Sequence, residues 1–237
     1  MSSAARRTLP QRSRPVPPLY IGDHLNQMEF HRRYEAHDGD DKFELIGGIV
    51  YMASPQRLPH SKYEPRMSTI LLLYEEATPG VEVMSNASTI LSDESEPQPD
   101  LALRIRPEYG GQSRTNKKKY VVGATELVAE IAHSTEAIDM GPKKDDYEQS
   151  GVQEYVVLCI EEQELHWFHF KSKSRIIPDA KGVYRSRVFP GLWIHGPSLL
   201  ARRLSPLLKI LKHGLASPEH AAFVNHLASA RRNGKKG

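Results

Sequence analysis

The chain has 237 residues, of which 39% are hydrophobic and 26% are charged, as is typical of a globular protein with one core. No run approaches the roughly 18 apolar residues of a membrane helix, and no signal peptide precedes the first charges, so we expect a cytoplasmic protein with no membrane partner. The net charge of +3 permits nucleic-acid binding without demanding it, and the single Cys159 excludes an internal disulfide and a cysteine-based zinc site.

An arm and a short helix are predicted at the start of the chain. Residues 1–18 contain four arginines, four prolines and no acidic residue. This composition cannot bury enough apolar surface to fold, so we predict a disordered basic arm. Segment 23–36 is compatible with a short helix that begins at Asp23, a residue type that caps helices. Its apolar stripe, Leu25 and Met28, is weak.

A β-hairpin is predicted over residues 43–52. The Gly47-Gly48 pair can adopt the positive φ angles of a tight turn between two apolar runs. Glu44 lies at the edge of the first run. From the residues alone, Glu44 is either a surface strand residue, which is the more common case, or part of a site.

A longer helix is predicted from about Ser61 to Ala77. Its apolar residues recur with helical spacing along one stripe: Tyr63, Met67, Ile70, Leu71 and Tyr74. We expect Ser61 to cap this helix and Pro65 to lie in its first turn. Proline has no N–H, and N–H groups in the first turn have no hydrogen-bond partner within the helix. His60 precedes the helix, and is either a capping or exposed histidine or a contact to the substrate.

Two acidic residues belong to the strands that are predicted next. After a strand over 81–91, the segment 99–105 alternates from Asp100 onward. Glu130 lies in the middle of the apolar strand predicted over 126–132. Because a buried charge is costly unless it is paired or bound to a metal, Glu130 is the strongest single-residue sign of a site.

The loop over residues 106–120 is basic and contains glycine. Its Lys117, Lys118 and Lys119 are candidate contacts to the substrate. Runs of this kind are more commonly a solvated surface, and both interpretations stay open.

The helix that follows Glu130 is predicted to begin at Pro142 and to end at Gly151, residue types favoured at those positions. Lys143 and Tyr147 are four residues apart and therefore share one face of this helix. Strands are then predicted over residues 154–160, 165–170 and 183–189.

The segment 198–237 departs from this alternation of strands and helices. It has a leucine-rich basic stretch broken by Pro206 and a helix start at Ser217-Pro218-Glu219. We predict a basic helical tail that contacts DNA, supports dimerisation, docks a partner or is a disordered appendage. The folded domain is then expected at residues 19–197.

Glu44, Asp100 and Glu130 would repel one another if the fold brought them together. At about 4 Å, each added carboxylate costs roughly 4 kcal/mol at an effective dielectric constant near 20. Such a cluster must take up a proton, pair with a cation or bind a metal, and its oxygen ligands favour Mg²⁺ or Mn²⁺ over zinc. Lys143 would orient or help to deprotonate an attacking water. In the alternative interpretation, Lys143 bridges a purely structural pair of acids.

Several motifs occur in a fixed order along the chain. They are Ser95-Glu96-Pro97-Gln98-Pro99-Asp100, Glu130-Ile131-Ala132-x-Ser134, Asp139-x-x-x-Lys143-x-x-x-Tyr147 and Gly151-Val152-x-Glu154-Tyr155. With Glu44-Leu45-Ile46-x-Gly48, Ser54-Pro55, His60-Ser61 and Phe189-Pro190-Gly191-Leu192, this set resembles the Uma2 family (DUF820). These are restriction-endonuclease-like proteins of the PD-(D/E)XK superfamily. The resemblance implies an α/β fold with a central mixed sheet flanked by helices. The N-terminal hairpin and the C-terminal helical tail are predicted from the residues themselves, and the tail is not part of the resemblance.

The resemblance also implies a metal-dependent endonuclease that hydrolyses DNA phosphodiester bonds. Asp100 and Glu130 match its Mg²⁺ or Mn²⁺ ligands, and Glu44 matches an acidic residue from the N-terminal part of the fold. Lys143 matches a lysine that has moved onto the following helix, which Asp139 and Tyr147 support. A homodimer is expected only by analogy with restriction enzymes that cut both strands.

One departure from the superfamily leaves a second function open. The usual lysine, two residues after the glutamate, is Ala132 here. Activity therefore depends on whether Lys143 reaches the site. If it does not, we expect a catalytically inactive nucleic-acid-binding protein of the same fold.

Overall fold

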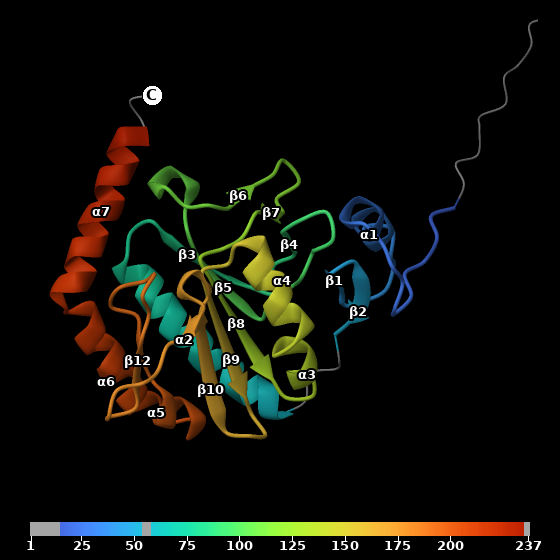
Figure 1. Cartoon of the computed structure of the whole chain (residues 1–237). Helices are drawn as coiled ribbons and strands as arrows, with labels where there is room; N and C mark the ends of the chain where they lie inside the picture. Colours follow the sequence, from blue (N-terminus) through green and yellow to red (C-terminus); the bar gives the residue numbers. More distant parts are fainter. Residues whose placement is uncertain (1–14, 54–57, 235–237) are drawn as a thin grey trace, which may run out of the picture.

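The structure is a computed structural model that describes residues 15–53 and 58–234. Its centre is a six-stranded mixed sheet with the order β11-β10-β9-β8-β5-β3 (Figure 1). Its strands are β3 (Val81–Ser85), β5 (Leu101–Ile105), β8 (Leu127–Ala132), β9 (Glu154–Cys159), β10 (Glu164–His169) and β11 (Ser174–Arg175). Only the β8–β9 pair is parallel; the other neighbours in this sheet are antiparallel. The predicted mixed sheet is therefore confirmed.

Helices cover both faces of this sheet (Figure 1). They are α1 (Gln27–Tyr34), α2 (Leu58–Ala77), α3 (Glu136–Asp139), α4 (Pro142–Ser150), α5 (Gly196–Leu200), α6 (Leu204–Leu215) and α7 (Pro218–Gly234). Short strands form three smaller sheets: β1 (Phe43–Ile46) with β2 (Ile49–Met52), β4 (Thr89–Ile90) with β6 (Arg114–Thr115) and β7 (Val121–Val122), and β12 (Val183–Arg185) with β13 (Trp193–His195). The short 3₁₀ helices η1 (Pro107–Tyr109) and η2 (Phe170–Ser172) complete the elements.

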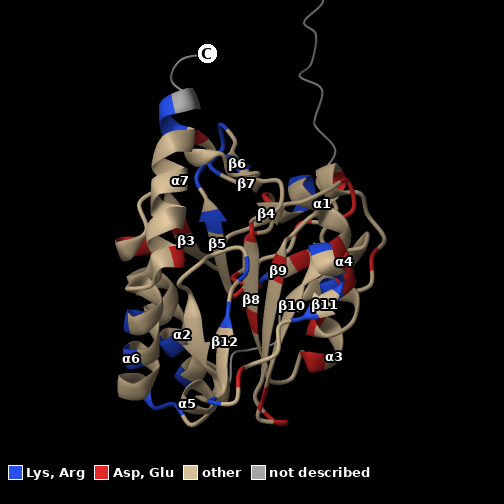
Figure 2. Cartoon of the chain, turned by 60° about the vertical axis from the view of Figure 1, so that its left-hand side comes forward, with Lys and Arg blue, Asp and Glu red and all other residues tan. Residues whose placement is uncertain are grey.

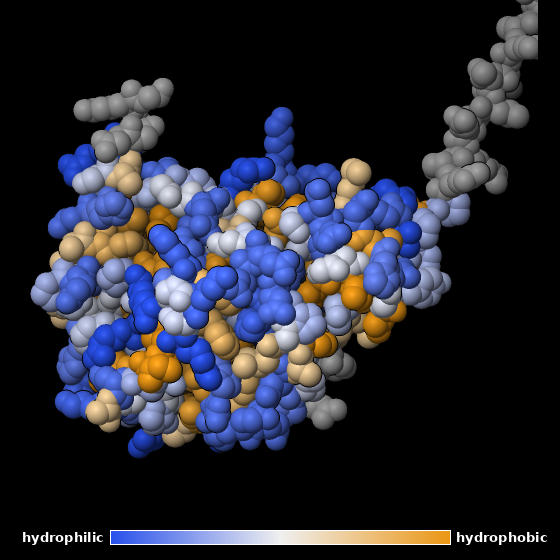
Figure 3. All heavy atoms as spheres, viewed as in Figure 1, coloured by the Kyte–Doolittle hydropathy of each residue, from blue (hydrophilic) through white to orange (hydrophobic). Residues whose placement is uncertain are grey.

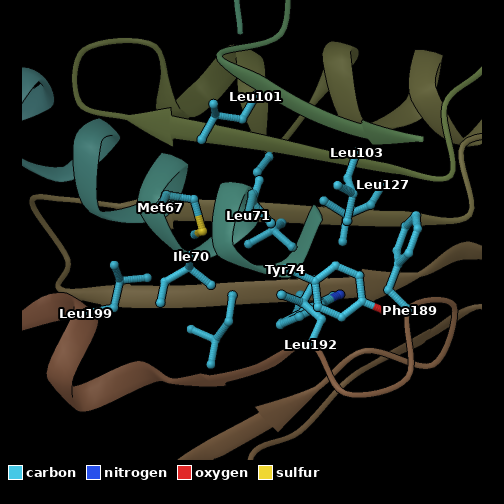
Figure 4. Packing of buried hydrophobic residues seen from close by; sticks show 14 of the residues in the cluster. Met67, Ile70, Leu71, Tyr74, Leu101, Leu103, Leu127, Phe189, Leu192 and Leu199 are labelled. Atoms are coloured by element: carbon cyan, nitrogen blue, oxygen red, sulfur yellow. The ribbon is translucent and has the colours of Figure 1, made fainter. Parts of the chain in front are cut away.

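The alternation of side chains along β8 divides the core between two faces of the sheet. Leu127 and its alternate neighbours pack toward α2 in the main hydrophobic cluster. Figure 4 shows Met67, Ile70, Leu71 and Tyr74 of α2 against Leu101, Leu103 and Leu127 of the sheet. Val128 and Ala132 point to the other face, where they pack with Tyr147 of α4. Glu130 has the same parity as Val128 and Ala132, so the strand presents its carboxylate on the α4 side.

The predicted hairpin is confirmed. β1 and β2 pair antiparallel, with Glu44 opposite Tyr51. Gly47 and Gly48 form the turn with φ angles of 56° and 77°. This left-handed backbone is available to glycine without steric cost.

Two helix starts differ from the sequence prediction. α1 begins at Gln27, and its cap is Asn26, whose Oδ1 accepts from the Glu29 amide at 2.9 Å. Asp23 instead accepts from the Tyr20 amide and from Arg33. The predicted cap at Asp23 and the predicted stripe are therefore wrong. Met28 is 76% exposed, and Phe30 is the buried residue of this helix.

The second difference concerns α2, which already includes Leu58. Ser61 is therefore not its cap, and its hydroxyl donates to the Leu58 carbonyl. Pro65 lies inside the helix rather than in its first turn. An internal proline costs about 3 kcal/mol. The buried stripe that faces the sheet offsets this cost, because it runs on both sides of Pro65.

The C-terminal helices pack onto the same core as α2. Leu207 and Leu211 of α6 and Leu227 of α7 are buried in the main cluster. Pro206 lies in the first turn of α6 and does not break that helix. The described part of the segment 198–237, which ends at residue 234, is mainly helical as predicted and is not a disordered appendage. The division of the chain at residue 198 remains a prediction, and that position does not mark an end of the core.

The surface carries charge over most elements. Figure 2 shows Lys and Arg along α6 and near the C-terminal end of α7, and Figure 3 shows a face that is mostly hydrophilic with scattered hydrophobic side chains. Within residues 15–53 and 58–234, every helix is too short or too polar to cross a bilayer. Ser54-Pro55, residues 1–14 of the predicted arm and the last three residues of the tail lie outside the described residues.

Candidate active site

Four separate segments deliver the predicted site residues to one cavity of about 450 Å³. Glu44 comes from β1, Asp100 from the residue before β5, Glu130 from β8 and Lys143 from the first turn of α4. β5 and β8 are neighbours in the sheet, which brings Asp100 beside Glu130. The structure therefore brings together the four side chains that the sequence selected. His60 and Asp139 also line this cavity.

Lys143 is the centre of the contacts in this cluster. Its Nζ lies 2.9 Å from Oε1 of Glu130, 3.0 Å from Oε1 of Glu44 and 3.8 Å from Oδ1 of Asp139. The Lys143 side chain is only 6% exposed. It reaches the strand because side chains in the first turn of a helix point back toward the N-terminus.

Both oxygens of the Glu130 carboxylate accept hydrogen bonds. Its Oε1 also accepts from the Tyr147 hydroxyl at 2.9 Å, and its Oε2 accepts from the backbone N–H of Asp100 at 3.1 Å. Lys143 and Tyr147, one turn apart on α4, thus reach the same oxygen. This is the shared helix face that the four-residue spacing predicts.

Asp100 presents its two oxygens differently. Oδ2 accepts from the backbone N–H of Ile131 at 2.8 Å and from Nε2 of His60 at 3.0 Å. From the described residues, no hydrogen-bond donor reaches Oδ1. Glu44, by contrast, uses Oε1 to accept from the backbone N–H of Gln98 at 2.6 Å and is otherwise paired with Lys143.

Burial and mutual repulsion shift the protonation of this cluster. Burial raises the pKa of Glu130 well above its usual value, the charge of Lys143 opposes this, and Asp100 adds to it. Burial alone would lower the pKa of Lys143, but Glu130, Glu44 and Asp139 together raise it well above its usual value. Lys143 therefore keeps its proton, and a single ammonium contacts three carboxylates, with Asp100 in the same cavity.

The donor set fits a hard divalent cation. Among the described residues no donor reaches Oδ1 of Asp100, and Glu130 lies beside it in the same cavity. Mg²⁺ commonly uses one or two carboxylates and keeps several waters, so these two residues suffice. Over residues 15–53 and 58–234, groups of three His, Cys, Asp or Glu ligand atoms within 4.8 Å of one another occur only at Glu136, Cys159 and Glu162, which is a different set.

Asp139 and Tyr147 both contact the cluster, since Asp139 lies 3.8 Å from Lys143 and Tyr147 donates to Glu130. Asp139 is buried, and its Oδ2 accepts from the Thr135 hydroxyl at 2.6 Å. Its backbone carbonyl accepts from the hydroxyl of Tyr155 at 3.0 Å. The contact with Tyr155 ties the short helix α3 to β9 of the central sheet.

The candidate substrate contacts differ in their placement. His60 is neither a cap nor exposed, because it lies inside α2, is 9% exposed and bonds Asp100. Lys117, Lys118 and Lys119 lie in the exposed connection between β6 and β7 and do not line the cavity. Lys118 pairs with Glu35 at 2.8 Å.

Several functional contacts were not visible in the sequence. The backbone amides of Gln98 and Ile131 bind Glu44 and Asp100, and only the fold places them there. Ala132, where the superfamily usually has its lysine, is fully buried beside Tyr147 in the core. The periodicity of the strand could have indicated this burial, because Ala132 shares a face with Val128.

Comparisons with known proteins agree with this geometry. The profile of the Uma2 family, described as "Putative restriction endonuclease", matches residues 28–201. A crystal structure described as that of "a putative nuclease belonging to DUF820 from Anabaena variabilis" is similar, with a TM-score of 0.59 and 12% sequence identity. The match covers 75% of this chain and 98% of that chain, and at this identity it shows the fold. No curated protein matches the chain.

Proposed function

Because the chain belongs to the Uma2 family, we propose that it is a metal-dependent endonuclease that hydrolyses phosphodiester bonds of DNA. Asp100 and Glu130 hold Mg²⁺ or Mn²⁺, and Lys143 assists the attacking water. The observation that carries this proposal is the contact of 2.9 Å between Nζ of Lys143 and Oε1 of Glu130. Through this contact Lys143 places an ammonium from α4 where the superfamily usually has the ammonium of a lysine on the strand.

The two carboxylates have complementary roles toward the cation. Asp100 offers Oδ1, while its Oδ2 stays bonded to His60 and to the Ile131 amide. Glu130 is held in place by Tyr147 and by the Asp100 amide. A bound divalent cation supplies Lewis-acid polarisation of the phosphate and lowers the pKa of a bound water.

Lys143 acts as a hydrogen-bond donor and a fixed positive charge. The surrounding carboxylates raise its pKa well above the usual value, so it is an ammonium at neutral pH rather than a free base. An ammonium beside the scissile phosphate orients the attacking water and offsets the negative charge that builds up in the transition state. Glu44 balances this charge from β1 at 3.0 Å.

The electrostatics of the cavity make the cation a requirement for substrate binding. Acidic side chains outnumber basic ones on its wall, which includes Asp40, Asp41 and Asp139 besides the residues named above. A phosphodiester would be repelled by this wall alone. Asp100 and Glu130 would hold a divalent cation whose charge would offset that repulsion, and Lys143 would then contact the phosphate.

Cleavage of supercoiled plasmid by the purified chain tests this proposal. With Mg²⁺ or Mn²⁺ we expect nicked and linear products, and none with excess chelator. Asp100→Asn, Glu130→Gln and Lys143→Met should each remove the activity while the fold survives, as checked by circular dichroism. Lys209→Met, on α6 outside the cavity, is the matched control and should cut normally.

A catalytically inactive nucleic-acid-binding protein is the second candidate. It is favoured by the full commitment of Lys143 to three carboxylates and by Ala132 at the usual lysine position. This function predicts DNA binding that weakens with salt. It also predicts intact plasmid at every concentration of protein and divalent cation.

A further inference from the structure

We propose that His60 is a positioning residue of this site, which fixes the carboxylate of Asp100 so that Oδ1 is presented to a divalent cation. The inference rests on the proposed function, because it concerns how Asp100 serves as a ligand. It replaces the expectation that His60 contacts the substrate.

The two donors that the described residues offer to the Asp100 side chain converge on one oxygen. The backbone N–H of Ile131 fixes Oδ2 from β8 at 2.8 Å, and Nε2 of His60 reaches the same oxygen from α2 at 3.0 Å. Since a carboxylate only accepts hydrogen bonds, Nε2 of His60 carries the proton. Two donors from different elements define the plane of the carboxylate, and Oδ1 is left for a cation.

The imidazole itself is held by its surroundings. His60 lies in α2, whose buried stripe anchors it to the sheet, and its side chain is 11% exposed. The second ring nitrogen, Nδ1, is buried and makes no hydrogen bond to the described residues. The nearest acidic oxygen, on Glu64, is 3.7 Å away. The bond to Asp100 is therefore the polar contact that orients this ring.

This geometry separates positioning from substrate contact. Nε2 is occupied by Asp100, and Nδ1 is shielded from solvent, so neither nitrogen is free to meet a phosphate. Hydrogen-bond partners of metal-binding carboxylates commonly change metal affinity by about 10–100-fold when they are removed. An effect of this size is the expected signature of His60.

Calorimetric titration with Mn²⁺ alone, in the absence of DNA, tests the inference. His60→Gln and His60→Asn form a matched pair, because the amide nitrogen of Gln reaches about as far as Nε2, whereas that of Asn stops near Nδ1. We expect His60→Asn to weaken Mn²⁺ binding by about 10–100-fold and His60→Gln to restore most of it. His133→Gln is the control, because His133 lines the same cavity but pairs with Glu161.

The variant Asp100→Asn distinguishes failure of the proposed role of His60 from failure of the metal site itself. If it loses Mn²⁺ binding while both His60 variants bind like the wild type, the role of His60 is refuted and the proposed function stands. If Asp100→Asn binds Mn²⁺ like the wild type, the metal site itself is refuted. Equal losses in His60→Gln and His60→Asn, with unchanged melting temperatures, would also contradict positioning by a hydrogen bond.

Discussion

Nζ of Lys143 lies 2.9 Å from Oε1 of Glu130, although the two residues belong to a helix and to a strand of the central sheet. The superfamily usually places both charges on one strand, two residues apart. Here that strand position is Ala132, which is fully buried. The following helix begins close enough to the strand for its first turn to supply the ammonium instead. The ammonium and the carboxylate thus meet in space, although the usual spacing of two residues is absent from the sequence.

Loss of Lys143 should lower the free energy of unfolding as well as remove the activity, although the variant still folds. Lys143→Met keeps the length of the side chain but leaves Glu130 and Glu44 buried without their cation, which costs about 3–5 kcal/mol. Urea denaturation at pH 7 measures this loss. Lys144→Met is the control, because the partly exposed Lys144 forms a surface pair with its neighbour Asp145 and should change the free energy of unfolding by about 1 kcal/mol or less. An unchanged midpoint for Lys143→Met would show that the contact contributes nothing to stability.

Tyr147 should contribute mainly through its hydroxyl. Tyr147→Phe keeps the ring that packs against Tyr155 but removes the donor to Glu130. A hydrogen bond to a charged group contributes about 1.5–3 kcal/mol, and we expect the free energy of unfolding to fall by that amount. Tyr20→Phe, at a residue that is 64% exposed, should leave it unchanged. Equal stability of both variants would refute the role of the hydroxyl.

Asp146 should make stability depend on pH. Burial raises the pKa of Asp146 to about 6, and a hydrogen bond from Ser95 opposes this shift. Because an unfolded aspartate has a pKa of about 3.9, the folded chain binds more protons between these values. This contribution is fully present below pH about 4 and is lost as the pH rises through about 6.

Asp146→Asn provides the measurement of this effect, because the amide cannot ionise. Relative to the wild type, the variant should become more stable as the pH rises from 4 to 7 in urea denaturation series. A constant difference between the two proteins across this range would show that Asp146 titrates in the folded state as it does in the unfolded state.

The C-terminal helices should be required for the fold. Leu211 of α6 is 1% exposed in the main core, so Leu211→Ala should cost about 2–5 kcal/mol. Leu204→Ala, at the 39% exposed start of the same helix, should cost far less. Removal of residues 199–237 should then unfold the chain instead of only weakening an interaction. A deletion variant with wild-type melting would show that the tail is dispensable.

Short-range patterns were sufficient for most elements of the fold. The Gly47-Gly48 turn, the alternation around Glu130 and the Pro142 to Gly151 helix each follow from local backbone preferences, and all three predictions are confirmed. The position of Glu130 was also informative, because an apolar strand tolerates a buried charge only beside a partner.

Long-range packing decided what the sequence could not predict. α2 begins before Ser61 and continues through Pro65. Burial of its apolar stripe outweighs the local preference of serine for a helix cap and the cost of an internal proline. The same packing places His60 against Asp100, which no sequence spacing indicates. The segment 198–237 was predicted to be a separate basic tail, although its leucines pack into the main core. Periodicity shows which residues are apolar but not which surface they cover.

The most direct test of the account is the single-turnover rate of DNA cleavage by the wild type and by Asp100→Asn over a range of Mg²⁺ concentrations. We predict a wild-type rate that rises with Mg²⁺ to saturation, and no cleavage by Asp100→Asn at any concentration. Cleavage by Asp100→Asn at the wild-type rate, or wild-type cleavage that persists in excess chelator, would contradict the proposed site.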